Sequence, residues 1–185
     1  QNQWELYFNP RLIGTTHHHK VIAGYAGAVS HFHMNSPTVD NTVDEKQHNV
    51  YVEITTPLPH QIDLTLGGRD VWQDNTIQKL SHGTVHSLDQ AFVSEQGLSW
   101  QPDDRWRIYL RRDGNFSFSK ANEQTSLYQG ITSLQPQTGV SYETGATLAT
   151  EKQKAAFSLY HLLLHNEIAF NPEQTATNPF GAYQN

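Results

Sequence analysis

The chain has 185 residues, no cysteine and a formal net charge of −6 at pH 7, and only 16% of its residues are charged. The lack of cysteine excludes disulfides, thiolate metal ligands and cysteine nucleophiles. The negative charge argues against a protein that binds nucleic acid over its whole surface. No window reaches the roughly 18 consecutive apolar residues of a membrane helix, which predicts a chain without a membrane span.

The polar surface depends on Gln, Asn, Ser and Thr, because the charged fraction lies below the roughly 25% usual for globular proteins. This composition favours an extracytoplasmic, secreted protein. No signal peptide opens the chain, which begins with Gln, so we expect a processed or trimmed form of a longer precursor. The length fits a single globular domain over residues 1–172, followed by an extended C-terminal tail over residues 173–185.

Most of the chain predicts β-strands. Alternation of apolar and polar residues, or a strand-like composition, predicts strands over residues 4–8, 49–56, 61–66, 70–80 and 82–93. We expect the third strand to end at Gly67-Gly68, turns at Asn75 and Gly83, and a loop over residues 94–104. The Gly-rich stretch over residues 126–146 predicts one or two further short strands.

One segment, residues 151–169, predicts a helix. It is rich in good helix formers, Thr150 and Gln153 have the spacing of a capping box, and Asn171-Pro172 provides a stop signal. Its apolar surface is wide, which predicts burial against the rest of the fold or against a partner chain. The fold class expected is therefore α+β and β-rich: an antiparallel sandwich or curled sheet with one long C-terminal helix packed against it.

Five of the eleven histidines lie at the two ends of the segment 16–34. A reversal of the chain between Gly24 and Gly27 would pair the two halves of this segment. One face would then carry His17, His19, His31 and His33. At cross-strand spacing these imidazoles can hold a divalent ion such as zinc or copper, or ligate a haem iron. The alternative is that they simply face solvent.

Five of the twelve Lys and Arg residues lie within residues 105–120, around an Asp113-Gly114 pair that favours a two-residue hairpin turn. Pairing across this turn predicts a patch for a ligand or a protein partner. The patch comprises Arg105, Arg107, Tyr109, Arg111, Phe116, Phe118 and Lys120. Such a face can bind an anion, a sugar or a stacked base. The alternative is that the arginine stems lie over a half-buried aromatic row.

These features lead us to expect an exported, non-catalytic binding or assembly protein whose histidine-rich face holds a metal or a haem-type cofactor. One alternative is a small metal-dependent hydrolase or phosphodiesterase that uses the same histidines, although their face carries no Asp or Glu to act as a base. A second alternative is a structural subunit of a pilus, capsid or secretion assembly. In that case self-association, or binding of a protein partner, would use the C-terminal helix or tail.

Overall fold

The computed structural model describes residues 2–16, 18–36, 39–79, 83–120, 123, 134–173 and 181–185. Every element in this part of the chain is a β-strand, and all the pairings are antiparallel. The predicted α+β class is therefore wrong. No helix in these ranges has the length and apolar character needed to cross a membrane.

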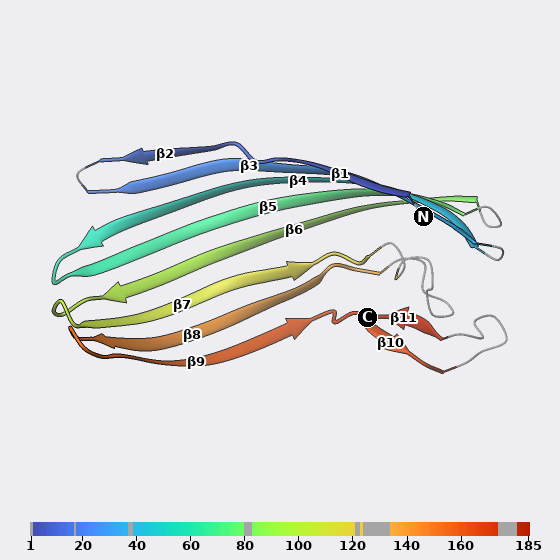
Figure 1. Cartoon of the computed structure of the whole chain (residues 1–185). Helices are drawn as coiled ribbons and strands as arrows, with labels where there is room; N and C mark the ends of the chain where they lie inside the picture. Colours follow the sequence, from blue (N-terminus) through green and yellow to red (C-terminus); the bar gives the residue numbers. More distant parts are fainter. Residues whose placement is uncertain are drawn as a thin grey trace.

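Nine strands form one large sheet, and a short hairpin forms a second sheet. The large sheet contains β1 (Asn2–Phe8), β2 (Arg11–Thr15), β3 (Lys20–Ser36), β4 (Val39–Leu58), β5 (Ile62–Lys79), β6 (Gly83–Trp100), β7 (Trp106–Ser117), β8 (Gln137–Ala149) and β9 (Lys154–His165). The hairpin pairs β10 (Ala169–Asn171) with β11 (Ala182–Gln184). In the large sheet, β1 and β2 both pair with β3, and β3 to β9 follow in chain order (Figure 1).

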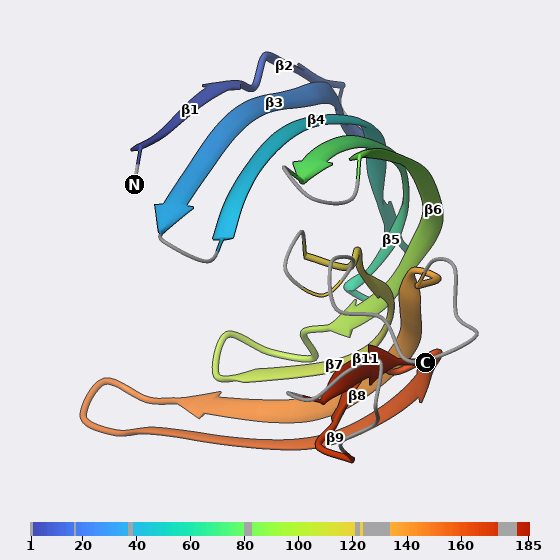
Figure 2. The same cartoon turned by 90° about the vertical axis from the view of Figure 1, so that its right-hand side faces the viewer.

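The large sheet is strongly curved. Seen along the sheet, β3 to β9 follow a curve, and the end of β7 turns inward on the inner side of this curve (Figure 2). The connections β4–β5, β6–β7 and β8–β9 lie together at one end of the strands (Figure 1). We refer to this as the turn end, and to the two faces of the sheet as its concave and convex sides.

The residues at the end of β7 identify the concave side. Phe118 is buried there and packs with Val71 of β5 and Ala91 of β6, and Phe116 packs against this cluster. Because side chains alternate along a strand, every second residue of β5 and β6 counted from Val71 and Ala91 also faces the concave side. This small cluster is the core of the described structure.

The convex side is apolar over a broad band. On β4, the predicted alternation over residues 49–56 is confirmed: Val50, Val52 and Ile54 point to the convex side and are 42%, 47% and 42% exposed. The same side of the neighbouring strands exposes Leu66, Leu98, Trp100, Trp106, Ile108, Leu110, Tyr142, Phe157 and Leu159. The sheet therefore presents most of its large apolar side chains outward, the reverse of a water-soluble fold.

Hydrogen bonds link neighbouring connections at the turn end. Gln101 N–H donates to the carbonyl of Gln61 (3.0 Å), and Ala149 N–H donates to that of Arg105 (2.8 Å). The Asp103 carboxylate accepts from the backbone N–H groups of Arg105 (2.8 Å) and Trp106 (2.9 Å), just before β7. These two hydrogen bonds lower the pKa of Asp103, because they stabilise its charged form.

The predicted helix over residues 151–169 is wrong, because β9 occupies most of it and pairs with β8 from Lys154 to His165. The signal read as a helix cap is a hairpin turn instead. Gln153 N–H does donate to Thr150 Oγ1 (3.0 Å), as at a helix start, but Thr150 N–H donates to the Gln153 carbonyl (2.8 Å) and closes the hairpin. Pairing along a whole strand outweighs the helix propensity of the segment.

Several predicted strand ends are also wrong. β5 runs through Gly67-Gly68 and Asn75, and β6 runs on to Trp100, where a loop was expected. The expected hairpin at Asp113-Gly114 is absent, because β7 continues past it while paired with β8. Gly114 serves close packing rather than a turn: a Cβ placed there would lie 2.8 Å from Val93 Cβ. The predicted strand over residues 4–8 is confirmed by β1.

The remaining expectations fall partly outside the described residues. Residues 126–133 and 174–180 lie in undescribed ranges, whereas Gln137–Ala149 forms β8 within the Gly-rich stretch where short strands were expected. At the C-terminus, where a tail was expected, Ala182 is buried and Tyr183 packs on Phe170, with ring centroids 5.2 Å apart. The Asn185 side chain donates to the carbonyl of Gln135 (2.7 Å).

Two tyrosines on the concave side each cover a glycine of the next strand. The Tyr51 ring lies over Gly24, and the Tyr109 ring lies over Gly145. A Cβ at Gly145 would fall 2.7 Å from both the Tyr109 ring and the carbonyl oxygen of Phe157. The missing side chain lets the ring lie flat against the neighbouring backbone, which holds the tyrosine in place.

We expect Gly145→Ala to lower the free energy of unfolding by about 1–3 kcal/mol, because the tyrosine and a backbone carbonyl must both move to admit the methyl group. A denaturant titration of the folded protein measures this difference. Gly14→Ala is the matched control, since nothing lies within 4 Å of a Cβ at Gly14. Equal effects of the two substitutions would contradict the proposed packing.

Candidate functional site

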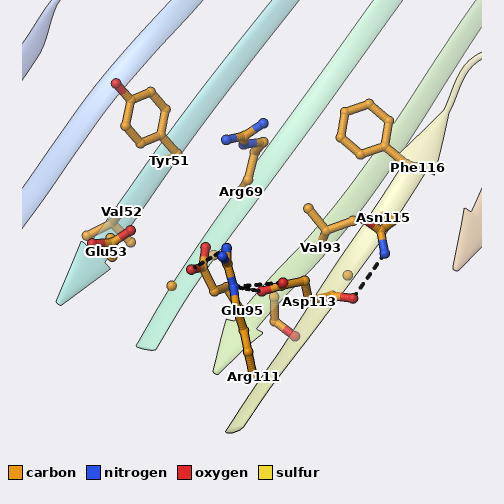
Figure 3. Close-up of a pocket in the computed structure, with 14 residues that line it drawn as sticks. Tyr51, Val52, Glu53, Arg69, Val93, Glu95, Arg111, Asp113, Asn115 and Phe116 are labelled. Atoms are coloured by element: carbon orange, nitrogen blue, oxygen red, sulfur yellow. Dashed lines mark hydrogen bonds and ion pairs between the residues drawn. The ribbon is translucent and has the colours of Figure 1, made fainter. Parts of the chain in front are cut away.

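Two adjoining hollows lie on the concave side over β4 to β8. The first has a volume of about 450 Å³ and is lined by side chains from four strands (Figure 3). Its polar and aromatic lining residues are Tyr51, Glu53, Arg69, Ser94, Glu95, Arg111, Asp113, Asn115 and Phe116. Strand alternation explains the lining: the residues that point away from the apolar convex band must point into the hollow.

Arg111 is the centre of an ion-pair network in this hollow. Its Nη2 donates to Glu95 Oε1 (3.0 Å), and its Nε lies 2.7 Å from Asp113 Oδ2. The side chain of Asn115 extends the network by donating to Ser141 Oγ (3.1 Å) and to the Asp113 carbonyl (3.2 Å). The network joins β6, β7 and β8, so it fixes the lower part of the hollow in Figure 3.

Arg69 stands apart from this network. Its guanidinium carbon lies 5.8 Å from the centroid of the Tyr51 ring, within the range of a cation–π contact. In the part of the chain that the structure describes, Arg69 forms no ion pair. Figure 3 shows it on β5, between Tyr51 of β4 and Phe116 of β7.

The second hollow lies nearer the turn end and shares Glu53, Glu95 and Arg111 with the first. Tyr109 donates from its hydroxyl to Glu143 Oε1 (2.6 Å). Arg107 donates from Nε to Ser99 Oγ (3.0 Å). The two hollows together carry four carboxylates and three guanidinium groups, so their surface is strongly polar but almost balanced in charge.

Nearer the far end of β5, the concave side carries buried amides. Gln73 and Asn75 are 5% and 1% exposed. Gln73 donates to Glu45 Oε2 and to Asn75 Oδ1, both at 3.3 Å, and Asn75 donates to Ser87 Oγ at 3.5 Å. The bonds to Glu45 and Ser87 cross between strands, and together they pair part of the polar groups that the sheet buries; Asn49 Oδ1 and Asp89 Oδ2 are buried without a partner among the described residues. These bonds give this region a structural role.

The predicted basic patch is brought together in part. Arg107, Tyr109 and Arg111 lie on one side of β7 and line the second hollow, and Phe116 lines the first. The other members lie elsewhere. Arg105 is in the β6–β7 connection, where its Nη2 lies 3.7 Å from Asp103 Oδ2. Phe118 is buried in the core, and Lys120 is exposed beyond the end of β7. The face is formed by β7 together with the strands β6 and β8 that pair with it. The hairpin that was expected to form this face is absent.

The reversal expected between Gly24 and Gly27 is absent, because β3 is continuous from Lys20 to Ser36. His19 and His31 are therefore about 40 Å apart along an extended chain, at about 3.3 Å per residue. His31 and His33 do share the convex side, as strand alternation predicts. His17 lies outside the described residues.

Each of two predicted histidines has a partner of its own. His31 Nδ1 lies 2.7 Å from Asp44 Oδ1, and its ring stacks on Trp4 with centroids 6.0 Å apart. His19 Nδ1 lies 3.0 Å from Thr56 Oγ1. Within the described ranges, no group of three or more His, Asp or Glu side chains is placed to hold a metal ion. Binding of zinc, copper or haem by this chain stays a prediction from the sequence.

Five residues that line the two hollows were not predicted from the sequence as members of a site: Tyr51, Glu53, Arg69, Glu95 and Glu143. The alternation over residues 49–56 does place Tyr51 and Glu53 on one face, opposite a purely apolar face. On its own, such alternation is equally typical of a half-buried strand whose polar face meets water. The correct reading needs the neighbouring strands, which show that the polar face is enclosed by the curvature of the sheet.

A curved antiparallel sheet with an apolar convex side and a charged concave side defines the wall of a β-barrel. The chain matches the family model "TonB dependent receptor-like, beta-barrel" over residues 2–185. The chain therefore belongs to this family. A search of curated proteins gave no match.

Solved receptors show the same fold. The alcaligin outer membrane receptor FauA from Bordetella pertussis matches 98% of this chain with a TM-score of 0.71 and 16% identity, over 33% of its own length. The ferric citrate transporter FecA matches 98% with a TM-score of 0.70 and 15% identity, over 30% of its length. FpvA from P. aeruginosa, solved with a pyoverdine–iron complex, matches 98% of this chain with a TM-score of 0.65 and 16% identity, over 28% of its own length. This chain thus spans about a third of these receptors.

The family membership corrects several predictions. The predictions of an exported binding or assembly protein, of a metal-dependent hydrolase, and of a pilus or capsid subunit are all wrong. The classification as a secreted, metal-binding protein is wrong too, whereas the presence of a particular zinc, copper or haem cofactor is not tested by the family match. The prediction of no membrane span is also wrong, because it considered only apolar helices. A partner site on a C-terminal helix fails because β9 replaces that helix. The coarse prediction of an extracytoplasmic protein is confirmed.

We expect the Arg111–Asp113 pair to show a coupling energy of roughly 0.5–1 kcal/mol in a double-mutant cycle of unfolding, since the Arg111 side chain is 49% exposed and water screens the pair. The cycle uses Arg111→Ala, Asp113→Ala and the double variant. A parallel cycle between Arg111 and Glu53, which share the hollow but form no ion pair in the described structure, should give a coupling near zero. Equal coupling in both cycles would show that the network has no specific pairing.

Proposed function

We propose that this chain is part of the wall of an outer-membrane receptor that takes up an iron chelate with energy supplied through TonB. The observation that carries the proposal is the asymmetry of the sheet: an apolar convex side faces lipid, and a charged concave side encloses a polar interior. Within a bilayer, all backbone polar groups must be paired internally, which continuous antiparallel strands achieve. Family membership and the likeness in fold to FauA, FecA and FpvA support the same function.

The arrangement of the connections supports an orientation across the membrane. Outer-membrane barrels have short turns on the periplasmic side and longer loops outside the cell. Here the connections β4–β5, β6–β7 and β8–β9 at the turn end have only three to five residues. At the opposite end, two residues separate β3 from β4 and three separate β5 from β6, but 19 separate β7 from β8, so the long connection lies at that end. We therefore place the turn end in the periplasm. Trp100 and Trp106, on the convex side near this end, are suited to the membrane–water boundary, where aromatic side chains gather.

We expect Leu66→Lys to destabilise the folded receptor in lipid vesicles by roughly 2–4 kcal/mol, because the substitution places a charge on the lipid-facing side. Thr65→Lys is the matched control: it lies one residue away and lines the second hollow, so its new charge meets a polar surface. Equilibrium unfolding in vesicles measures both variants. A larger loss for the Thr65 variant would contradict the proposed orientation of the sheet.

The transport function is tested by uptake of radioactive iron into the native host. Cells receive a panel of ferric chelates with carboxylate, catecholate or hydroxamate groups. Removal of the receptor gene should lower uptake of at least one chelate by about tenfold or more, and removal of TonB should lower uptake of the same chelate equally. Uptake that is unchanged for every chelate, or that does not depend on TonB, would contradict the proposal.

A further inference from the structure

We infer that two copies of the receptor associate in the membrane through the convex side of β6, where Arg112 of each copy pairs with Asp70 of the other. The inference rests on the proposed function in one respect, because that function places the convex side in lipid. A polar stripe crosses the otherwise apolar band of this side. It consists of Asp70 on β5, Gln90 and Ser94 on β6, and Arg112 on β7.

The strand register places both charges of the stripe on the convex side. Asp70 pairs with Val50, which points to that side. Arg112 pairs with Gln96, and Gln96 is the second residue from the convex-facing Leu98. The two charged side chains therefore project outward, one on either side of β6.

Both charges lie within the expected thickness of the bilayer. Arg112 Nη1 donates to Ser94 Oγ at 3.0 Å, and Ser94 precedes Trp100, at the periplasmic boundary, by six residues. Asp70 follows Ile62, the register partner of Trp100, by eight residues. With a rise of about 3.3 Å per residue and a tilt of about 40°, these levels are about 15 and 20 Å from the boundary, inside an apolar band of about 25 Å. Charges at such depths are costly unless they are paired.

Within the described chain, each of these charges bonds only to a neutral side chain. Arg112 donates to Ser94, and Asp70 accepts from Gln90 Nε2 at 3.1 and 3.2 Å. Further strands of a barrel wall would continue from the edges of the sheet, at least three strands or about 14 Å away from β5 and β7, and a domain inside the barrel would meet the concave side. A countercharge must therefore approach from the lipid side.

The positions of the two charges suit a two-fold axis that runs along the membrane normal over β6. Arg112 and Asp70 lie on β7 and β5, one strand to either side of β6 (Figure 1). A rotation of 180° brings β7 of one copy opposite β5 of the other, so two identical ion pairs form. The Arg112 side chain leans toward the level of Asp70, because Ser94 is two residues nearer than Gln96 to Phe92, the register partner of Asp70.

A second copy satisfies the stripe better than a lipid does. A lipid phosphate can pair with Arg112 but leaves Asp70 without a cation, whereas a second copy provides both countercharges. The centre of the stripe also permits close approach. Ser94 and its register partner Gly68 are small, and Phe92 beside them is 69% exposed, so its ring is free to pack against the other copy.

The test uses the full-length receptor in lipid vesicles, without any other cysteine, and with Ser94→Cys as a reporter beside the two-fold axis. Oxidation should link two copies through a disulfide between the two introduced cysteines. Val52→Cys is the matched control, because Val52 is also on the convex side and is in register with Ser94 through Gly68, but lies two strands from β6. We expect at least about tenfold less linked dimer in this control.

The charges are then exchanged in the Ser94→Cys receptor, after circular dichroism has shown that each variant is folded. Arg112→Glu alone, or Asp70→Lys alone, should lower the linked fraction about tenfold, because each places like charges opposite one another in the dimer. Mixing the two variants before reconstitution should restore linkage between them. Each copy then meets two charges of opposite sign, which pairing within one chain cannot reproduce.

Four results would overturn the inference. Three concern linkage: equal linkage at residues 94 and 52, linkage that does not respond to either charge reversal, and a mixture that links no better than the separate variants. The fourth is a monomeric receptor that retains an anionic lipid in the wild type and loses it in Arg112→Glu, which would make the lipid the partner. Linkage does not require transport, so failure here is distinct from failure of the uptake experiment.

Discussion

Continuous antiparallel pairing of the main chain is the constraint on which the rest of this structure depends. β4 and β5 pair from end to end, from Asn41 with Lys79 to Leu58 with Ile62, and β5 and β6 do the same. These ladders satisfy the backbone polar groups without water, so the sheet does not need a thick apolar core to remain folded. The only described core cluster is accordingly small, and most large apolar side chains are on the convex side.

Strand alternation converts this pairing into two different surfaces. If one face of a strand meets lipid, the other face must carry the polar side chains, and curvature gathers these from several strands around a common hollow. The Arg111 network and the Tyr109–Glu143 bond are cross-strand contacts of this kind, so they tie neighbouring strands together as well as lining the interior. Arg69 differs because its guanidinium group lies over the Tyr51 ring of the neighbouring strand, 5.8 Å from the ring centroid, and pairs with no carboxylate of the described residues.

The errors of the sequence analysis have a common cause, which the segment 151–169 illustrates. On β9, Leu162 and Leu164 face the same side as Ser141 and Gly139 of β8, whereas Leu163 faces the opposite side with Val140. A strand that is apolar on both faces loses the period of two, and its helix-forming residues then suggest a helix. Local sequence signals also predicted turns at Asp113-Gly114 and between Gly24 and Gly27, although each of these positions lies inside a long paired strand.

The sequence by itself determined the local alternation of apolar and polar side chains along individual strands. The alternation over residues 4–8 and 49–56 correctly assigned strands, and on β4 it separated Val50, Val52 and Ile54 from Tyr51 and Glu53. Period alone does not say which face meets water, because lipid and a protein core select the same apolar side chains. Only the tertiary structure decided that the apolar face is convex and exposed. Pairing with distant strands also decided where each strand ends and which charged residues meet in the hollow, since those contacts join segments far apart in the chain.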